Sequence, residues 1–442
     1  MPSPAPPKQD VFGNMVPWAE PQWYRGLPSP YYKDSHRKLR KAIREWNEEH
    51  LMDVAFDWEE NKQIDPKVYE QMGKDGLLVA LAFGRKVPAK WAKPDGTVFG
   101  GVKADEWDGF HDMILISELV RNGSLGSNQG LTGGMQIGLP PVYHFGSQEL
   151  QDRILPDVLA GRKRICLAIT EPEAGSDVKN LSCEAVRSAD GKHYIVNGTK
   201  KWITNGVYSD YFTTAVRTKG KAGDAGGISF LLIPKTEGVT CRRMIMSGQW
   251  CSGTTLLSFD NVKVPVENLI GQENQGFRMI MTNFNHERLM IIYIAQQLAR
   301  ICIEDALKHA HERKVFGKPL IESDLIKMKF ANMARMVDSQ QTWIESIVYQ
   351  IENMSHEEAN LKLGGTTALL KAHCSMVLED VARDAVQVLG GIAHTRGGKG
   401  ERIERIRRDV KGVAIPGGSE EIMSLFAVKQ ECKVAIGLGA KL

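Results

Sequence analysis

The sequence has little that would cross-link the protein, anchor it in a membrane or give it a strong charge. Its seven cysteines are odd in number and include no Cys-x-x-Cys pair, which excludes a disulfide framework and a paired-cysteine zinc site. No apolar run approaches the roughly 18 residues of a membrane-spanning helix. The formal net charge is only +3, so overall charge gives no reason to expect a nucleic-acid binder.

Several motifs of common enzyme classes are also absent. Neither Gly-x-Gly-x-x-Gly nor Gly-x-x-x-x-Gly-Lys-Ser/Thr occurs, which disfavours a nicotinamide-binding Rossmann domain and a nucleoside-triphosphate site. The hydrolase elbow Gly-x-Ser-x-Gly is missing too. The run His286-Glu287-Arg288-Leu289-Met290 begins like the helix of a zinc protease, but the second histidine is replaced by Met290. We therefore expect no metal there.

What is present is ordinary globular composition over a long chain. With 442 residues, 42% hydrophobic and 25% charged, the chain should form two or three packed domains. The first 30 residues hold eight of the 19 prolines, which predicts an extended segment over residues 1–31. Apolar residues such as Leu39, Ile43 and Trp46 then recur at helical spacing, and residues 32–165 are predicted to be a helical domain.

The periodicity changes after residue 165. Short runs rich in β-branched and aromatic residues, bounded by turn residues, predict a β domain over residues 166–275, with strands at 193–196, 211–216, 228–233 and 255–259. Residues 276–442 return to helical patterns, at about 277–313, 326–350, 360–389 and 418–435. The expected fold is mainly α with a β domain: an N-terminal helical domain, a central β-barrel or sandwich, and a C-terminal antiparallel four-helix bundle.

Two stretches carry a specific resemblance. The run Leu167-Ala168-Ile169-Thr170-Glu171-Pro172-Glu173-Ala174-Gly175-Ser176-Asp177, followed by Lys201-Trp202-Ile203-Thr204-Asn205-Gly206, closely resembles the flavin signature of the acyl-CoA dehydrogenase family. The similarity continues through Arg313-Lys314-Val315-Phe316-Gly317, Gln387-Val388-Leu389-Gly390-Gly391 and Arg408-Asp409. It covers nearly everything from Tyr32 to the last helix, in the same helix, β, helix order. The cofactor that it implies is FAD.

The resemblance assigns roles to individual positions. Ile169, Thr170, Trp202 and Thr204 would surround the isoalloxazine ring, and Ser176 would meet both cofactor and acyl-CoA. Arg313, Phe316, Gln387 and Gly391 correspond to positions that reach the FAD of a neighbouring subunit, which implies a homo-oligomer, in this family a tetramer built as a dimer of dimers. The remaining cofactor positions are Leu167, Ile203, Gly390, Ser419, Glu421 and Asp324, the last of which stands where many relatives have Gln.

The position of the catalytic base departs from the common pattern. The family removes a proton α to a thioester while hydride leaves the β carbon, so a carboxylate must face the flavin across the acyl chain. Most members carry it as Glu in a segment that here reads Ile415-Pro416-Gly417-Gly418-Ser419, so the usual base is replaced by Gly417. Isovaleryl-CoA and long-chain acyl-CoA dehydrogenases place it before an Arg on the helix that opens the C-terminal domain. Glu287, followed by Arg288, occupies that place.

The loss at 417 and the gain at 287 complement each other, so Glu287 is predicted to be the general base. Its apolar flanks Leu289 and Met290 would disfavour a solvated carboxylate. The backbone N–H of Gly417 would still hydrogen-bond the thioester oxygen. By the same resemblance, Asn285, Arg288 and Gly418 would contact the substrate.

Other readings stay open at this point. A nitroalkane oxidase or an oxygen-inserting monooxygenase could use the same scaffold, as could a DNA-associated relative of the alkylation-response type. The electron acceptor, electron-transfer flavoprotein or oxygen, is not readable. The chain ends in Ala440-Lys441-Leu442, a variant of the Ser-Lys-Leu peroxisomal address, and shows no transit-peptide pattern, so we expect the peroxisomal matrix, and otherwise the cytoplasm or mitochondrion.

Overall fold

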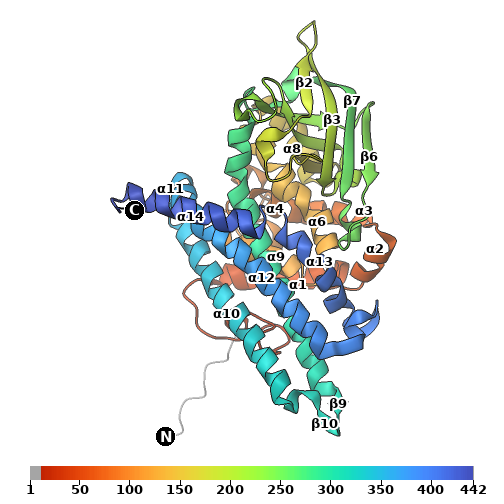
Figure 1. The fold of residues 1–442 in the computed structure, drawn as a ribbon, viewed down its shortest axis with the longest axis vertical. Coiled ribbons are helices and arrows are strands. Elements are labelled where there is room, and N and C mark those ends of the chain that lie inside the picture. Colours follow the sequence, from red (N-terminus) through yellow and green to blue (C-terminus); the bar gives the residue numbers. More distant parts are fainter. Residues whose placement is uncertain (1–10, 442) are drawn as a thin grey trace.

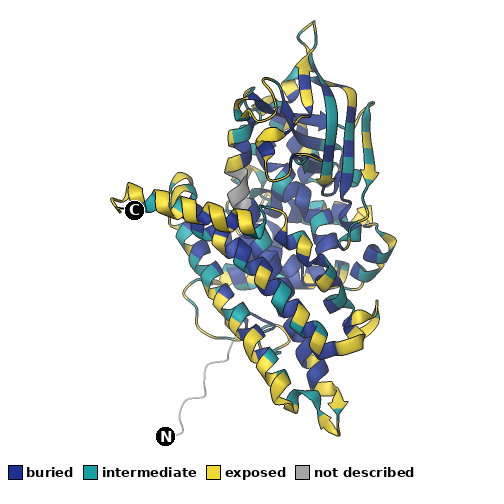
Figure 2. Cartoon of the chain, in the orientation of Figure 1, coloured by how far each residue is buried: buried dark blue, intermediate teal, exposed yellow. Residues whose placement is uncertain are grey.

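The computed structural model describes residues 11–441, apart from the side chains of 282–286 and 356. It forms three regions in chain order, with a β domain at one end of the molecule and a helical bundle at the other (Figure 1). Figure 2 shows buried residues concentrated where these elements meet, and exposed residues along the outer faces of α10 (Asp324–Glu352) and α14 (Glu420–Gly437). No helix in the described part is long and apolar enough to cross a membrane.

The N-terminal region is helical, as the spacing of its apolar residues predicts. Leu39 and Ile43 are fully buried on the first helix, and the third helix starts at Pro66, capped by Asp65, and stops at Gly76 with a φ of +81°. The helices are α1 (Asp34–His50), α2 (Ala55–Asn61), α3 (Pro66–Asp75), α4 (Leu77–Phe83), α5 (Gly109–Leu119), α6 (Leu125–Gly133), the π-helical turn η4 (Gly134–Gly138), α7 (Pro140–Phe145) and α8 (Gln148–Leu159).

The central region is an eight-stranded sheet in the order β6-β7-β3-β2-β4-β5-β8, with β1 paired in parallel to β4. Strands β4 and β5 are buried along nearly their whole length, which shows that both faces of the sheet are covered there. The strands are β1 (Ile165–Ala168), β2 (Glu184–Arg187), β3 (His193–Ile203), β4 (Tyr211–Arg217), β5 (Ile228–Pro234), β6 (Val239–Arg243), β7 (Thr255–Pro265) and β8 (Leu269–Ile270).

The C-terminal region is the expected bundle with one predicted helix divided, one helix added and a short hairpin after its first helix. The predicted helix 360–389 is divided at Leu363, where Gly364-Gly365 lets α14 approach closely, because a side chain at 365 would meet Glu431. A helix over 401–414 was not predicted from the sequence. The elements are α9 (Gly276–Glu312), the hairpin β9 (Lys314–Val315) and β10 (Lys318–Pro319), α10 (Asp324–Glu352), α11 (His356–Lys362), α12 (Gly364–Leu389), α13 (Glu401–Ala414) and α14 (Glu420–Gly437).

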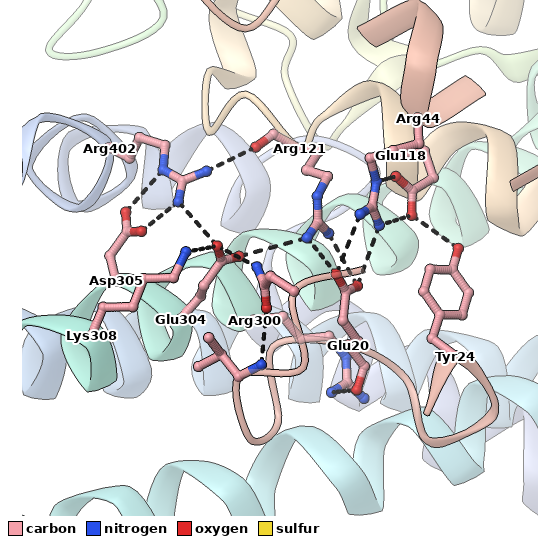
Figure 3. A network of polar contacts seen from close by, with 12 residues as sticks. Glu20, Tyr24, Arg44, Glu118, Arg121, Arg300, Glu304, Asp305, Lys308 and Arg402 are labelled. Atoms are coloured by element: carbon pink, nitrogen blue, oxygen red, sulfur yellow. Dashed lines mark hydrogen bonds and ion pairs between the residues drawn. The ribbon is translucent and has the colours of Figure 1, made fainter. Parts of the chain in front are cut away.

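The described part of the N-terminal segment enters the interior. Glu20 is 1% exposed and accepts hydrogen bonds from Arg44 of α1 and from Arg121, which follows α5. Figure 3 shows these groups in a network that also contains Glu118, Glu304, Asp305, Lys308 and Arg402. Arg300 of α9 donates to the carbonyl oxygen of Trp18 at 2.7 Å. The segment is therefore fastened both by its backbone and by a buried carboxylate.

The seven cysteines are all free. Burial raises the pKa of the Cys166 thiol to about 12, so this thiol stays protonated and unreactive at neutral pH.

Candidate active site

The signature residues of the β domain meet where strands β1 and β3 end. Ile169 and Thr170 follow β1, and the backbone N–H of Lys201 on β3 donates to the Thr170 carbonyl oxygen at 2.9 Å. The next residue, Trp202, has a φ of +59° and leaves 43% of its surface exposed. A large indole held in a left-handed backbone conformation and open to solvent is costly without a function, which marks this edge as a binding surface.

A buried ion pair that the sequence reasoning missed holds this edge together. Lys200 Nζ donates to Glu171 Oε1 at 2.7 Å and to the carbonyl oxygen of Ile169 at 2.9 Å. Burial raises the pKa of Glu171, but the charge of Lys200 and hydrogen bonds from the N–H groups of Ser182 and Cys183 outweigh it, so that the pKa is lowered. Glu171 therefore stays ionised and fixes the signature loop against β3.

The residues at this edge fit a flavin. Thr170 and Thr204 are half-buried, and within the described residues neither hydroxyl has a hydrogen-bond partner. Thr204 lies against Gly133, where an added Cβ would be 3.6 Å from its methyl group, so α6 closes one side. Two free hydroxyls and an open indole are what a flat ring with a polar edge requires. Thr170, Trp202 and Thr204 would hold FAD here.

The remaining predicted residues of this region lie beside it in different environments. Leu167 is half-buried on β1, Ile203 is buried at the end of β3, and Ser176 is exposed in the loop after the signature run. Ile203 thus packs the sheet beneath the site, whereas Ser176 is accessible to a ligand. The side chain of Asn285 lies outside the described residues.

The predicted base and the segment that lacks it converge on one turn of α9. Glu287 and Arg288 are each 7% exposed. Arg288 Nε donates to the carbonyl oxygen of Gly417 at 3.4 Å, and a Cβ added at 417 would come within 2.8 Å of Ile291 Cδ1. Residues 287 and 291 are one helical turn apart and share a face. A carboxylate on either segment would reach the same volume.

The turn around Gly417 is itself held from α12. Buried Lys371 donates from Nζ to the carbonyl oxygens of Ala414 and Gly418, both at 2.6 Å. Gly417 and Gly418 have φ values of +69° and +99°, which favour glycine. Ser419 caps α14 by accepting from the N–H of Ile422 at 3.4 Å. Among the described residues the N–H of Gly417 has no acceptor, so it is free to donate to a ligand.

Lys371 is a second residue that the sequence reasoning missed, because it pairs with carbonyl oxygens more than 40 positions away. Burial lowers the pKa of its ammonium to about 8, partly offset by the charge of Glu420. Arg288 shows the same balance, since burial lowers its pKa and the charge of Glu287 opposes that shift. Glu421 is exposed on the first turn of α14. The site thus gathers cations around the turn at 417.

The other predicted cofactor residues lie at the opposite end of the bundle. Arg313 follows α9, some 26 residues and about 39 Å of helix beyond Glu287. Phe316 is fully exposed at the tip of the β9–β10 hairpin, which Figure 1 shows far from the β domain. Gln387, Gly390 and Gly391 are exposed at the end of α12, and Asp324, exposed at the start of α10, pairs with Lys327 at 3.1 Å. One chain cannot bring both groups to one flavin.

A large cavity lies near the base helix but on its other face. It has a volume of about 700 Å³ and is lined by α4, α7, α11, α12 and Leu289 of α9. Leu289 follows Glu287 by two residues, so its side chain points about 200° around the helix. Among the described residues of α9, it is Leu289 and not Glu287 that borders this cavity.

A possible metal cluster is explained by helix capping. His36, Asp108 and His111 bring ligand atoms within 4.8 Å of one another. Asp108 Oδ1, however, caps α5 by accepting from the N–H groups of Phe110 and His111, and His36 Nδ1 accepts from the N–H of Lys33 at 2.8 Å. Asp108 Oδ1, which also hydrogen-bonds His36 Nε2 at 2.9 Å and His111 Nδ1 at 2.8 Å, is thus already engaged in capping α5 and in pairing with both histidines.

Comparison with known proteins agrees with this geometry. Family models match three consecutive parts of the chain: the acyl-CoA dehydrogenase N-terminal domain over residues 33–162, the middle domain over 166–262 and the C-terminal domain over 274–430. The chain belongs to the acyl-CoA dehydrogenase family. It is an FAD-dependent oxidoreductase that dehydrogenates acyl-CoA thioesters.

Individual relatives span nearly the full length of this acyl-CoA dehydrogenase. It is 44% identical to acyl-CoA dehydrogenase apdG of Emericella nidulans, over 95% of this chain and 96% of the relative. It is 40% identical to acyl-CoA dehydrogenase AFT10-1 of Alternaria alternata, over 96% and 97%. A probable acyl-CoA dehydrogenase from Mycobacterium abscessus, solved by crystallography, has a TM-score of 0.80 and 33% identity, covering 90% of this chain and 99% of that one. The predicted fold class is thereby confirmed.

Proposed function

We propose that Glu287 is the general base of this acyl-CoA dehydrogenase and that the product is a trans-2-enoyl-CoA. One observation carries the proposal: Gly417, at the position where most relatives have their catalytic Glu, lies against the turn of α9 that bears a buried Glu287. A carboxylate removed from water is a stronger base than a solvated one, because burial disfavours its charged form. This supports proton abstraction from a substrate lying between α9 and the edge formed by Thr170, Trp202 and Thr204.

Other groups around Glu287 would bind the thioester oxygen and hold the turn at Gly417 in place. The N–H of Gly417 would donate to the thioester oxygen, where negative charge develops as the α proton leaves. Such a donor is typically worth about 10²–10³ in rate. Lys371 would keep that N–H in place by holding the carbonyl oxygens on both sides of it. When bound, FAD supplies the acceptor for the hydride from the β carbon.

Arg288 and Ser176 would contact the CoA portion of the substrate. Arg288 lies between the 417 turn and the ring of Phe426, with 5.2 Å from its guanidinium carbon to the ring centroid. Ser176 is exposed near the flavin edge. Contacts to the thioester's carrier group, rather than to its reacting carbons, would lower the Michaelis constant more than they would change the chemical step.

The test is reduction of bound flavin by acyl-CoA without oxygen. A panel of straight and branched acyl-CoAs should bleach the flavin absorbance of the wild-type protein. Glu287→Gln should keep the FAD spectrum and lose bleaching, because an amide cannot accept the α proton. Glu379→Gln, which changes a partly exposed carboxylate on α12, is the matched control and should bleach normally.

Unchanged bleaching by Glu287→Gln would reject the base assignment. Bleaching by nitroalkanes but not by any acyl-CoA would instead favour a nitroalkane oxidase on this scaffold, and reoxidation with insertion of oxygen into the product would favour a monooxygenase.

We also propose that the flavin site is completed by a second subunit. Arg313, Phe316, Gln387 and Gly391 are too far from Glu287 to serve the flavin of their own chain, and Phe316 exposes its whole side chain. A dimer of dimers would bury them. Phe316→Asp should lower the molar mass by light scattering and weaken FAD retention together, and an unchanged assembly with unchanged FAD content would contradict this proposal. Electron-transfer flavoprotein or oxygen as acceptor, β-oxidation as the process and the peroxisomal matrix as the location stay predictions.

A further inference from the structure

Two buried amide side chains on α6 and η4 lack hydrogen-bond partners within the described residues. Asn128 is 2% exposed and leaves both its Oδ1 and its Nδ2 unpaired; Gln136 is 3% exposed and leaves its Nε2 unpaired. Each unsatisfied buried polar group costs about 1–3 kcal/mol. Native proteins satisfy most such groups, so a pair of them in one stretch of helix calls for an explanation.

Both amides point away from the β domain. Gly126 and Gly130 pack on the loop around Cys251, with an added Cβ 3.1 Å from its Sγ and from its carbonyl oxygen. Gly134 and Gly138 pack in the same way on β1. Asn128 lies two residues from both glycines of the first pair, and Gln136 two residues from both of the second. Two residues correspond to about half a turn in the α-helix α6 and in the π-helical turn η4 alike, so both amides face the helical interior.

Contacts at the two ends of the stretch from residue 121 to residue 145 show which residues of α9 lie opposite each amide. Arg121 Nη2 lies 3.7 Å from Glu304 Oε2 of α9. At the other end, Phe145 and Met279 both lie beside Gly271. The stretch from α6 to α7 therefore runs antiparallel to α9. At equal rise per residue, this places Gln136 roughly level with residues 287–290 and Asn128 roughly level with residue 297.

The acyl chain of a substrate held at Glu287 would therefore pass Gln136 first and Asn128 about 12 Å further in, since eight residues separate the two. Between them the wall is apolar, with Leu131 and Met135 buried. Thr132 is not a third free group, because its hydroxyl donates to the carbonyl oxygen of Asn128 at 2.9 Å. A plain hydrocarbon tail would leave both amides unsatisfied.

We propose that this enzyme acts on acyl-CoAs whose chain carries oxygen, as a hydroxyl or carbonyl group, and that Gln136 and Asn128 recognise that oxygen. Gln136 Nε2 can donate to either kind of oxygen, whereas Asn128 has a donor and an acceptor free and so matches a hydroxyl group. The inference rests on the proposed function, because it requires an acyl chain extending from Glu287.

The competing explanation is that a buried water satisfies each amide. Gln297 is an example of a buried amide with room for such a water. Gln297 also has an unpaired Nε2, but it borders a cavity of about 20 Å³ together with Tyr24, Tyr293 and Gln296. That volume holds one water, which needs about 10–15 Å³. Gln297 therefore needs no ligand and serves as the matched control for the two amides facing the substrate.

The test compares decanoyl-CoA with decanoyl-CoAs that carry one hydroxyl group at successive carbons from the fifth to the tenth, or one keto group at successive carbons from the fifth to the ninth. In the wild-type enzyme at least one oxygenated member should have a kcat/KM about threefold to tenfold above that of decanoyl-CoA, the worth of one buried neutral hydrogen bond. Gln136→Met and Asn128→Leu should remove this preference, each for a different oxygen position. Gln297→Met should leave it unchanged.

Urea unfolding provides a second readout. Replacing an unsatisfied buried amide with an apolar side chain of similar size should not lower the free energy of unfolding, so loss of the preference could not be ascribed to misfolding. A wild-type preference for decanoyl-CoA over every oxygenated member, or a ratio unaffected by both variants, would overturn the inference and leave the amides as water sites. If plain acyl-CoA bleaches the flavin through Glu287 without any oxygen preference, this inference alone fails. If no acyl-CoA bleaches it, the proposed function fails as well.

Discussion

Moving the base back to position 417 should not restore activity in this protein. The variant to make is Glu287→Gln combined with Gly417→Glu, which puts the carboxylate where most of the family has it. Gly417 has a φ of +69°, and a side chain there costs about 1–2 kcal/mol. Its Cβ would lie 2.8 Å from Ile291 Cδ1, so Ile291 must leave its rotamer for about 1 kcal/mol more. The double variant should therefore lose about 2–3 kcal/mol of unfolding free energy.

Two measurements follow, urea unfolding and the rate of anaerobic flavin bleaching by acyl-CoA. Gly417→Ala alone should show most of the stability loss, because it carries the strain without a carboxylate. The double variant should bleach at less than a tenth of the wild-type rate. Adding Ile291→Ala removes the close contact and should recover part of that rate. Full bleaching by the double variant, with wild-type stability and Ile291 intact, would refute the reasoning that the backbone at 417 rejects a side chain.

Two further predictions concern buried charges outside the reacting centre. Glu20→Ala should lower the free energy of unfolding, measured by urea denaturation, by about 3 kcal/mol, because it leaves Arg44 and Arg121 buried with less negative charge. A loss under about 0.5 kcal/mol would show that the network in Figure 3 contributes little to stability. For Lys371, the folded pKa of about 8 lies below its ordinary value of 10.5, so the unfolded chain binds more protons between these values. The free energy of unfolding of the wild-type protein should accordingly rise relative to that of Lys371→Met, by up to about 3 kcal/mol, as pH increases through that window. Parallel plots of unfolding free energy against pH for the two proteins would contradict the lowered pKa of Lys371.

Local patterns were enough to predict the order of the three regions and four strands of the β domain, β3, β4, β5 and β7, whereas β1, β2, β6 and β8 were not predicted. The alternation around Tyr194 and Val196 and the helical spacing of Leu39 and Ile43 reflect burial that each segment shows by itself. The convergence of Glu287 and Gly417 was predictable only by resemblance, and the contacts on α9 now support it.

Residues whose roles depend on distant partners could not be read from the sequence. Lys371 looks like any lysine on a helix until Ala414 and Gly418 are seen beside it. The pair of Lys200 and Glu171 is similar, since neither residue stands out without its partner 29 positions away. The unpaired amides of Asn128 and Gln136 carry no pattern at all, because only the packing shows what a side chain fails to contact.

The N-terminal segment has a consequence for the order in which the protein assembles. Arg300 donates a hydrogen bond to the carbonyl oxygen of Trp18, which lies 282 positions away in the chain. Asn14 donates one to the carboxylate of Glu304, which lies 290 positions away. During synthesis Asn14 and Trp18 cannot make these two contacts until two thirds of the polypeptide has left the ribosome. Contacts between such remote residues form late, because the loop they close is long. The two helical regions should thus mature as one cooperative unit rather than in sequence, and a nascent chain stalled before α9 should leave the Trp18 carbonyl without its partner Arg300.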